Sequence, residues 1–280
     1  MRIEEIPYEK RFFTQNFYPK IERSEAPRGF PEPYWMDESR GLYLFQGAAE
    51  ELTPLLIRPG SVDLIMTDPR YDSHGLRSYR ALREIAETTL KPGALLFAYT
   101  GAEFLPEVME MLSTPRDLPL DPAIPVGPRR GELEWFYLFN DRHSIKPRMF
   151  TKALMVSSKP ILAFRRSGYS KSRDSLAWTH TDSEGKADKR YHKWGQGSVF
   201  SAYHISKRTD PGYWILDPYA GGGTTLEVCR DLSRNCLTFE IDELACERIA
   251  TRMSQQVLDL GPPSDIAETL PLYNAPPDCE

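Results

Sequence analysis

Two polar motifs in this chain carry residue types that can do chemistry, and each follows an apolar run typical of a strand. The first is Asp68-Pro69-Arg70-Tyr71, and the second is the glycine-rich stretch DPYAGGGTT at residues 217–225. Glycines between a strand and a helix permit left-handed backbone angles and let a ligand approach the main chain closely. The second motif therefore predicts a small-molecule site.

The glycine-rich stretch lacks the spacing of the common phosphate-binding loops. A P-loop places a lysine before its Ser or Thr, whereas here Gly223 precedes Thr224. The dinucleotide spacing G-x-G-x-x-G fails as well, because Leu226 holds its last position. Glu240 ends the next apolar run about 20 residues beyond the turn, where a carboxylate binds ribose hydroxyls. These features favour an adenosine-containing ligand with no phosphate beside the turn. The structural alternative is a tight turn followed by an acid that caps a strand.

Taken together, the two motifs resemble those of the S-adenosylmethionine-dependent DNA amino-methyltransferases, in the permuted order with the catalytic motif first. TDPRYD is similar to their Asp-Pro-Pro-Tyr motif, and LDPYAGGGTT is similar to their Asp-Pro-Phe-x-Gly-x-Gly-Thr-Thr motif. The segment FEIDELACERIATRM resembles the one that follows in the family, and the likeness runs from about residue 40 to 255. Two positions depart from the family pattern. Arg70 replaces the second proline, and Ala48 stands where an acid often follows the first strand.

The resemblance implies a catalytic set of Asp68, Pro69 and Tyr71. The Asp68 carboxylate and the Pro69 carbonyl would each accept one hydrogen of the target amine, and Tyr71 would stack on an extruded base. The cofactor implied is S-adenosylmethionine. The residues expected to bind it are Asp217, Tyr219, Ala220, Gly221, Gly223, Thr224, Thr225, Glu240 and Asp242.

The implied reaction is methyl transfer to an exocyclic amino nitrogen of double-stranded DNA with the base flipped out. N6 of adenine is preferred to N4 of cytosine because the motif opens with Asp68, whereas family members acting on cytosine more often open with Ser. The resemblance also implies a bacterial or phage setting, with or without a cognate restriction enzyme. Three alternatives stay open: an RNA base methyltransferase, a catalytically weak S-adenosylmethionine-holding DNA-binding subunit suggested by Arg70 and Ala48, and a small-molecule methyltransferase.

The charge distribution supports a polyanionic partner better than the net charge of −5 does. Residues 129–210 contain 17 Lys and Arg against 8 Asp and Glu, a net charge of +9, while the remainder has 18 against 32, a net charge of −14. Such a segment concentrates positive field where a phosphate backbone can meet it, although charge alone fits a solvated surface equally well. The candidate phosphate contacts are Arg70, Arg142, Lys146, Arg148 and Lys152.

Alternating apolar patterns predict the elements that position these motifs. Strands are expected at 42–45, 62–67, 94–100, 134–139 and 160–166, and helices at 48–57, 76–90, 102–113 and 198–208. A strand, glycine turn, helix, strand and helix should follow to about residue 253. The predicted fold class is α/β: a Rossmann-like methyltransferase fold with a mostly parallel sheet and helices on both faces. We expect an N-terminal arm at 1–40, a methyltransferase domain at 41–255 with a target-recognition region inserted at about 142–195, and a C-terminal tail at 256–280.

Several classes are disfavoured by the sequence. No apolar run reaches the roughly 18 residues of a membrane span, and the start MRIEEIPYEKRFF lacks the apolar core of a secretory signal, so we expect a cytoplasmic protein. The four cysteines show neither a metal-binding C-x-x-C pair nor disulfide density, which predicts reduced thiols and no metal.

Overall fold

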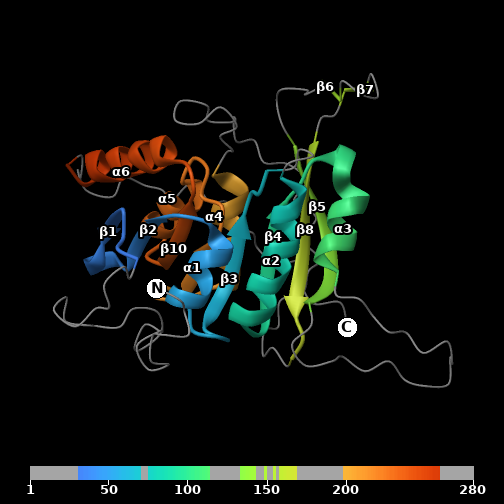
Figure 1. The fold of residues 1–280 in the computed structure, drawn as a ribbon, viewed down its shortest axis with the longest axis horizontal. Coiled ribbons are helices and arrows are strands. Elements are labelled where there is room, and N and C mark those ends of the chain that lie inside the picture. Colours follow the sequence, from blue (N-terminus) through green and yellow to red (C-terminus); the bar gives the residue numbers. More distant parts are fainter. Residues whose placement is uncertain are drawn as a thin grey trace, which may run out of the picture.

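The computed structural model describes residues 31–70, 75–113, 133–142, 148–149, 154–155, 158–168 and 198–258. Eight of the described strands form one sheet in the order β1-β2-β10-β9-β3-β4-β8-β5 (Figure 1). These strands are β1 (Trp35–Asp37), β2 (Leu42–Gln46), β3 (Val62–Thr67), β4 (Leu90–Tyr99), β5 (Leu133–Arg142), β8 (Ser158–Arg166), β9 (Trp214–Asp217) and β10 (Asn235–Glu240). A separate pair is formed by β6 (Arg148–Met149) and β7 (Leu154–Met155).

The centre of the sheet is parallel and its edges are antiparallel. Strands β2, β10, β9, β3 and β4 run parallel, whereas β1 pairs antiparallel with β2, and β8 pairs antiparallel with β4 and β5. The chain passes from β9 to β10 on one side and from β3 to β4 on the other, so the strand order reverses between β9 and β3. Open α/β sheets bind ligands beyond the carboxyl ends of their strands at such a switch point.

Helices cover both faces of the sheet (Figure 1). One face carries α1 (Ala49–Leu56), α2 (Leu76–Thr89) and α3 (Leu105–Leu112), and the other carries α4 (Val199–Arg208), α5 (Thr224–Asp231) and α6 (Glu243–Leu258). Two short 3-10 helices, η3 (Glu38–Arg40) and η4 (Ala102–Phe104), complete the described elements.

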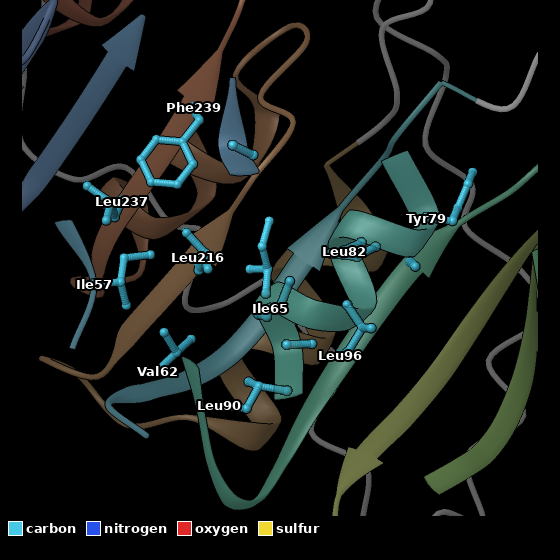
Figure 2. Close-up of a cluster of buried hydrophobic side chains, with 14 of the residues drawn as sticks. Ile57, Val62, Ile65, Tyr79, Leu82, Leu90, Leu96, Leu216, Leu237 and Phe239 are labelled. Atoms are coloured by element: carbon cyan, nitrogen blue, oxygen red, sulfur yellow. The ribbon is translucent and has the colours of Figure 1, made fainter. Parts of the chain in front are cut away.

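The inner strands of the sheet supply side chains to both layers because side chains alternate between the two faces of a strand. In β2, Tyr43 and Phe45 pack under α1 to α3, while Leu42 and Leu44 pack under α4 to α6. Figure 2 shows the first layer, where Leu82 from α2 meets the strands of the sheet. Burial of each such Leu, Ile or Phe stabilises the fold by about 1.5–3 kcal/mol. These contacts hold in place the sheet that carries the two motifs.

The predicted fold class is confirmed, and the elements lie close to their predicted positions. The strand predicted at 62–67 is β3 (Val62–Thr67) without any shift. The prediction ended the helix before β4 at Lys91-Pro92-Gly93, but these residues lie within β4, which begins at Leu90. The register shifts here because Val62 pairs with Leu90 while Leu64 pairs with Leu95, and Gly93 takes the positive φ of +81° that this bulge needs.

The range predicted to contain the target-recognition region, 142–195, includes a strand of the main sheet. Strand β8 (Ser158–Arg166) lies in the main sheet between β4 and β5, so this part of the range belongs to the core. Its apolar side chains are buried on both faces, which explains why the chain returns to the sheet here. Most of the remaining range lies outside the described residues.

The described end of the N-terminal arm is attached to the core. Strand β1 pairs with β2, which the sequence did not predict, and the Trp35 indole N–H donates to the Ser254 hydroxyl of α6 at 3.0 Å. Within the part of the chain that the structure describes, no helix is long and apolar enough to cross a membrane. The same described ranges contain no group of three His, Cys, Asp or Glu able to hold a metal ion.

Alanine substitutions at two glycines with positive φ test how closely α6 packs against the glycine-rich turn. Gly223 has φ +75°, and a Cβ there would lie 2.9 Å from both Arg252 Nη2 and Ile249 Cγ2; Gly212 has φ +83° and open space around it. Gly212→Ala should cost about 1–2 kcal/mol from backbone strain alone. Gly223→Ala should cost about 1–3 kcal/mol more because α6 must move. Urea denaturation of both variants measures this difference, and equal losses would contradict the packing of α6 against the turn.

Candidate active site

The first turn of the site begins where β3 ends, at Asp68. This carboxylate is 26% exposed, and both of its oxygens accept hydrogen bonds from the Lys159 ammonium at 2.7 Å. Lys159 stands on β8, is only 6% exposed, and has its Nζ 4.8 Å from the centroid of the Tyr99 ring. An acid at the end of one strand is therefore held by a base from an antiparallel strand two positions away in the sheet.

The residues after Asp68 are held by α2. The Tyr79 hydroxyl lies 2.8 Å from the Tyr99 carbonyl and 3.4 Å from the Pro69 carbonyl. Because a hydroxyl donates one hydrogen, the shorter bond to Tyr99 dominates, and the Pro69 carbonyl keeps acceptor capacity for another donor. The turn closes tightly, since a Cβ on Gly75 would collide with the Arg70 carbonyl oxygen.

The second turn of the site follows β9 and is fixed by Glu240 at the end of β10. The Gly221 N–H donates to Glu240 Oε2 at 2.8 Å, and the Asp242 N–H donates to Glu240 Oε1 at 2.9 Å. The Ala220 N–H donates to the Phe239 carbonyl at 2.8 Å. Glu240 thus has a fixed orientation beside the glycines, and a carboxylate with two such bonds still has lone pairs for hydroxyl groups.

The glycines of this turn differ in the space around them. Gly221 has φ +52°, and a Cβ there would meet nothing nearer than the Tyr219 carbonyl oxygen at 4.0 Å. The main chain at Gly221 is therefore open to a ligand, whereas Gly223 is packed against α6. This open surface next to an oriented carboxylate fits an adenosine moiety.

Arg252 of α6 binds the main chain of the turn and was not among the residues predicted from the sequence. Its Nη2 donates to the Gly222 carbonyl at 2.6 Å, and its Nη1 lies 3.7 Å from Glu227 Oε2. Arg252 lies on α6 three residues after Ile249, on the apolar face of that helix. The sequence offered one signal for this role, which is a charged residue within the apolar stripe of the predicted helix.

Hydrogen bonds join the two turns across the switch point. The Thr67 hydroxyl donates to Asp217 Oδ1 at 2.7 Å, and the Tyr219 N–H donates to the same oxygen at 3.2 Å. The Tyr219 hydroxyl donates to the Ser78 carbonyl of α2 at 2.9 Å. The ends of β3 and β9 are thereby fixed relative to each other, and with them the two motifs.

Asp217 is a buried acid with an altered affinity for protons. It is 3% exposed, and this burial raises its pKa from 3.8 to about 6, with the negative charge of Asp68 adding to the effect. Hydrogen bonds from Thr67, Thr225 and the Tyr219 N–H lower this pKa and offset part of the burial. Burial also raises the pKa of the Tyr219 phenol, so that this group stays protonated as a donor to Ser78.

Most of the predicted site residues that the structure describes lie at or near the β9–β3 junction. Their surroundings differ: some are buried, one caps a helix and one begins a helix. Asp217, Ala220 and Thr225 are buried beneath the turn. Asp242 Oδ1 accepts a hydrogen bond from the Ala245 N–H at 3.1 Å, which makes Asp242 the N-cap of α6. Thr224 begins α5.

The predicted DNA contacts are described only in part. Arg70 is exposed at the end of the first turn. Arg142 ends β5 and Arg148 begins β6. The side chains of these last two, together with Lys146, Lys152 and the predicted catalytic Tyr71, lie outside the described residues.

One family model matches the C-terminal part of the chain. The family model described as DNA methylase, for N6 and N4 enzymes, matches residues 174–252, which include the glycine-rich turn, Glu240 and Arg252. Over these residues the chain is similar to the N6/N4 DNA methylase family. No curated protein sequence matches this chain.

Solved structures resemble three quarters or more of this chain at low sequence identity. PvuII DNA methyltransferase, cytosine-N4-specific, has a TM-score of 0.58 at 14% identity, with 81% of this chain and 93% of that chain covered. M1.HpyAVI in complex with SAM has a TM-score of 0.53 at 16% identity, covering 75% and 98%. The TTHA0409 protein of Thermus thermophilus, complexed with S-adenosyl-L-methionine, has a TM-score of 0.56 at 15% identity, covering 76% and 93%. These likenesses establish the Rossmann-like methyltransferase fold.

The raised pKa of Asp217 gives a testable pH dependence. The folded state binds the Asp217 proton more tightly than the unfolded state does, so this group favours folding at low pH and loses that contribution as pH rises from about 4 to about 6. The shift from 3.8 to about 6 corresponds to about 3 kcal/mol. Asp217→Asn removes the ionisation and can keep the Thr67 hydrogen bond. Its free energy of unfolding, measured in urea, should therefore rise relative to that of the unmodified protein between about pH 4 and pH 7. A difference that does not change with pH would contradict the burial of an ionisable Asp217.

Proposed function

We propose that this chain transfers a methyl group from S-adenosylmethionine to an exocyclic amino nitrogen in DNA, with N6 of adenine as the preferred target. The main support for this proposal is that Asp68 and the glycine-rich turn lie at one switch point of the sheet. The Thr67–Asp217 hydrogen bond links the two strands that end there. A carboxylate that can orient an amine thus lies beside a turn that can hold an adenosine moiety.

S-Adenosylmethionine fits the second turn. Glu240 would bind the ribose hydroxyls, and the open main chain at Gly221 would lie against the ligand. Ile241 directly follows Glu240 and is 71% exposed, which offers an apolar contact for the adenine ring. Two proteins with the same fold, M1.HpyAVI and TTHA0409, were solved with this molecule, which supports the choice. Asp217, Thr225 and Asp242 would act by holding the turn and the start of α6 in place.

The first turn would prepare the amine. The nitrogen of an exocyclic amine is a poor nucleophile because its lone pair is conjugated into the ring. Asp68 and the Pro69 carbonyl would accept its two hydrogens, and this geometry favours a pyramidal nitrogen whose lone pair points at the donor. The methyl group is supplied on a sulfonium: the nitrogen forms a bond to the methyl carbon while the carbon–sulfur bond breaks with its electrons going to sulfur. The nitrogen then gives one proton to water.

The base must leave the duplex to reach Asp68, because the amine is inaccessible within a stacked helix. We propose that Tyr71 stacks on the flipped base. Arg70 is exposed, so its guanidinium can bind a DNA phosphate at the edge of the site, and Arg142, Lys146, Arg148 and Lys152 would extend this contact.

Adenine is preferred on the single ground that the catalytic motif opens with Asp68. The PvuII enzyme, which has the same fold, is cytosine-N4-specific, so the fold itself does not choose the base. Two rival functions can be tested against this one. The first is an RNA base methyltransferase. The second is a subunit that binds S-adenosylmethionine and DNA but turns over weakly, and it is suggested by Arg70 in the catalytic motif.

The decisive experiment follows a labelled methyl group. The purified protein is incubated with methyl-labelled S-adenosylmethionine and unmethylated DNA, and the digested nucleosides are separated by mass spectrometry. We expect label in N6-methyladenine. Label in N4-methylcytosine would contradict the choice of base, and label in RNA alone would contradict the choice of polymer. Cofactor binding with no label in either would favour the binding-subunit function.

Variants assign the two halves of the site in the same assay. Asp68→Ala should abolish transfer while the S-adenosylmethionine dissociation constant, measured by calorimetry, stays within about twofold. Glu240→Ala should raise that dissociation constant about tenfold or more, since a charge-assisted hydrogen bond contributes about 1.5–3 kcal/mol. Asp231→Ala is a matched control, because Asp231 is an exposed acid at the far end of α5. Loss of cofactor binding in Asp68→Ala would contradict this division of roles.

A further inference from the structure

Among the residues that the structure describes, Lys159 is the base that binds the proposed catalytic acid. Its Nζ lies 2.7 Å from both Asp68 oxygens, which is the geometry of a charge-assisted hydrogen bond to each. It reaches Asp68 from β8, the strand that pairs antiparallel with β4. Neither the glycine-rich turn nor the proposed DNA contacts include it.

The pair is buried unequally. The Lys159 side chain is 6% exposed, whereas that of Asp68 is 26% exposed. A buried ammonium is costly unless it is compensated, and the contacts of Lys159 include the Asp68 carboxylate and the face of the Tyr99 ring. Asp68, by contrast, keeps about a quarter of its side-chain surface accessible to solvent.

The carboxylate therefore has an inner and an outer side. Two oxygens offer about four lone-pair directions, and Lys159 occupies one on each oxygen. Rotation of the carboxylate would break one of the two short bonds, so the remaining lone pairs keep a fixed direction. A fixed acceptor is what the aiming of an amine lone pair requires.

We infer that Lys159 is a positioning residue for methyl transfer, which holds the Asp68 carboxylate in the orientation that accepts a hydrogen of the target amine. This inference rests on the proposed function. Lys159 also makes the pair neutral, so that the sulfonium of the methyl donor does not meet an uncompensated carboxylate that could bind it in place of the amine.

The unequal burial predicts how the pair responds to substitution. Asp68→Asn leaves the buried ammonium without its counter-charge, whereas Lys159→Met leaves a partly exposed carboxylate that water can solvate. Asp68→Asn should therefore lower the melting temperature more than Lys159→Met does. The double variant Asp68→Asn/Lys159→Met should recover much of the loss, which a double-mutant cycle on thermal unfolding measures.

The kinetic test compares two variants of Lys159 with a matched control. We expect Lys159→Met to lower kcat for DNA methylation at least tenfold with little change in KM for S-adenosylmethionine. Lys159→Arg should restore part of kcat, since a guanidinium can also bind both carboxylate oxygens. Lys91→Met removes a second Lys–Asp pair, Lys91 to Asp63 at 2.5 Å, which lies outside the site and should leave kcat unchanged.

The outcomes separate this inference from the proposed function. Active unmodified protein together with an unchanged kcat in Lys159→Met would overturn the positioning role alone. An equal loss of kcat in Lys159→Met and Lys159→Arg, with KM for the cofactor also raised, would show a structural role and overturn it too. If the unmodified protein transfers no methyl group, the proposed function falls and the role of Lys159 in transfer falls with it.

Discussion

The hydrogen bond from Thr67 to Asp217 is the interaction on which the rest of the site depends. It joins the last residue of β3 to the last residue of β9, at the place where the strand order of the sheet reverses. The two strands approach each other in a parallel pair through Leu64 and Ile65, and the residues beyond them form the two turns of the candidate site. A bond between the last residues of these strands therefore sets the distance between Asp68 on one side and the glycine-rich turn on the other.

The elements around this junction act as supports for the main chain of the two turns. Arg252 holds the Gly222 carbonyl, Glu240 holds the Gly221 N–H, and Tyr79 lies against the Pro69 carbonyl. Each support comes from a different element: α6, the end of β10 and α2. A buried polar group without a hydrogen bond is costly, so these bonds both stabilise the fold and fix the site. The same groups that satisfy the buried main chain leave Gly221 and the outer side of Asp68 open.

Much of the fold could be predicted from the sequence, because apolar periodicity and glycine punctuation are strong along β2 to β4 and β9 to α6. The β9 and β10 motifs indicated a cofactor turn from local spacing alone, and the structure places Glu240 on that turn. Long-range contacts could not be predicted in this way. Lys159 is separated from Asp68 by 91 residues, and it stands beside a proline at the start of a buried strand, where a single sequence reads it as part of a basic surface. The three-residue strand β1 was too short to show a period.

We propose that the methyl donor and the amine acceptor meet across the β9–β3 junction, and a crystal structure of this protein with S-adenosylmethionine tests this most directly. We expect the ribose on Glu240, the ligand against Gly221, and the sulfonium methyl directed toward Asp68, with Lys159 still bound to both Asp68 oxygens. A ligand bound away from the glycine-rich turn, or a methyl group directed away from Asp68, would contradict this arrangement.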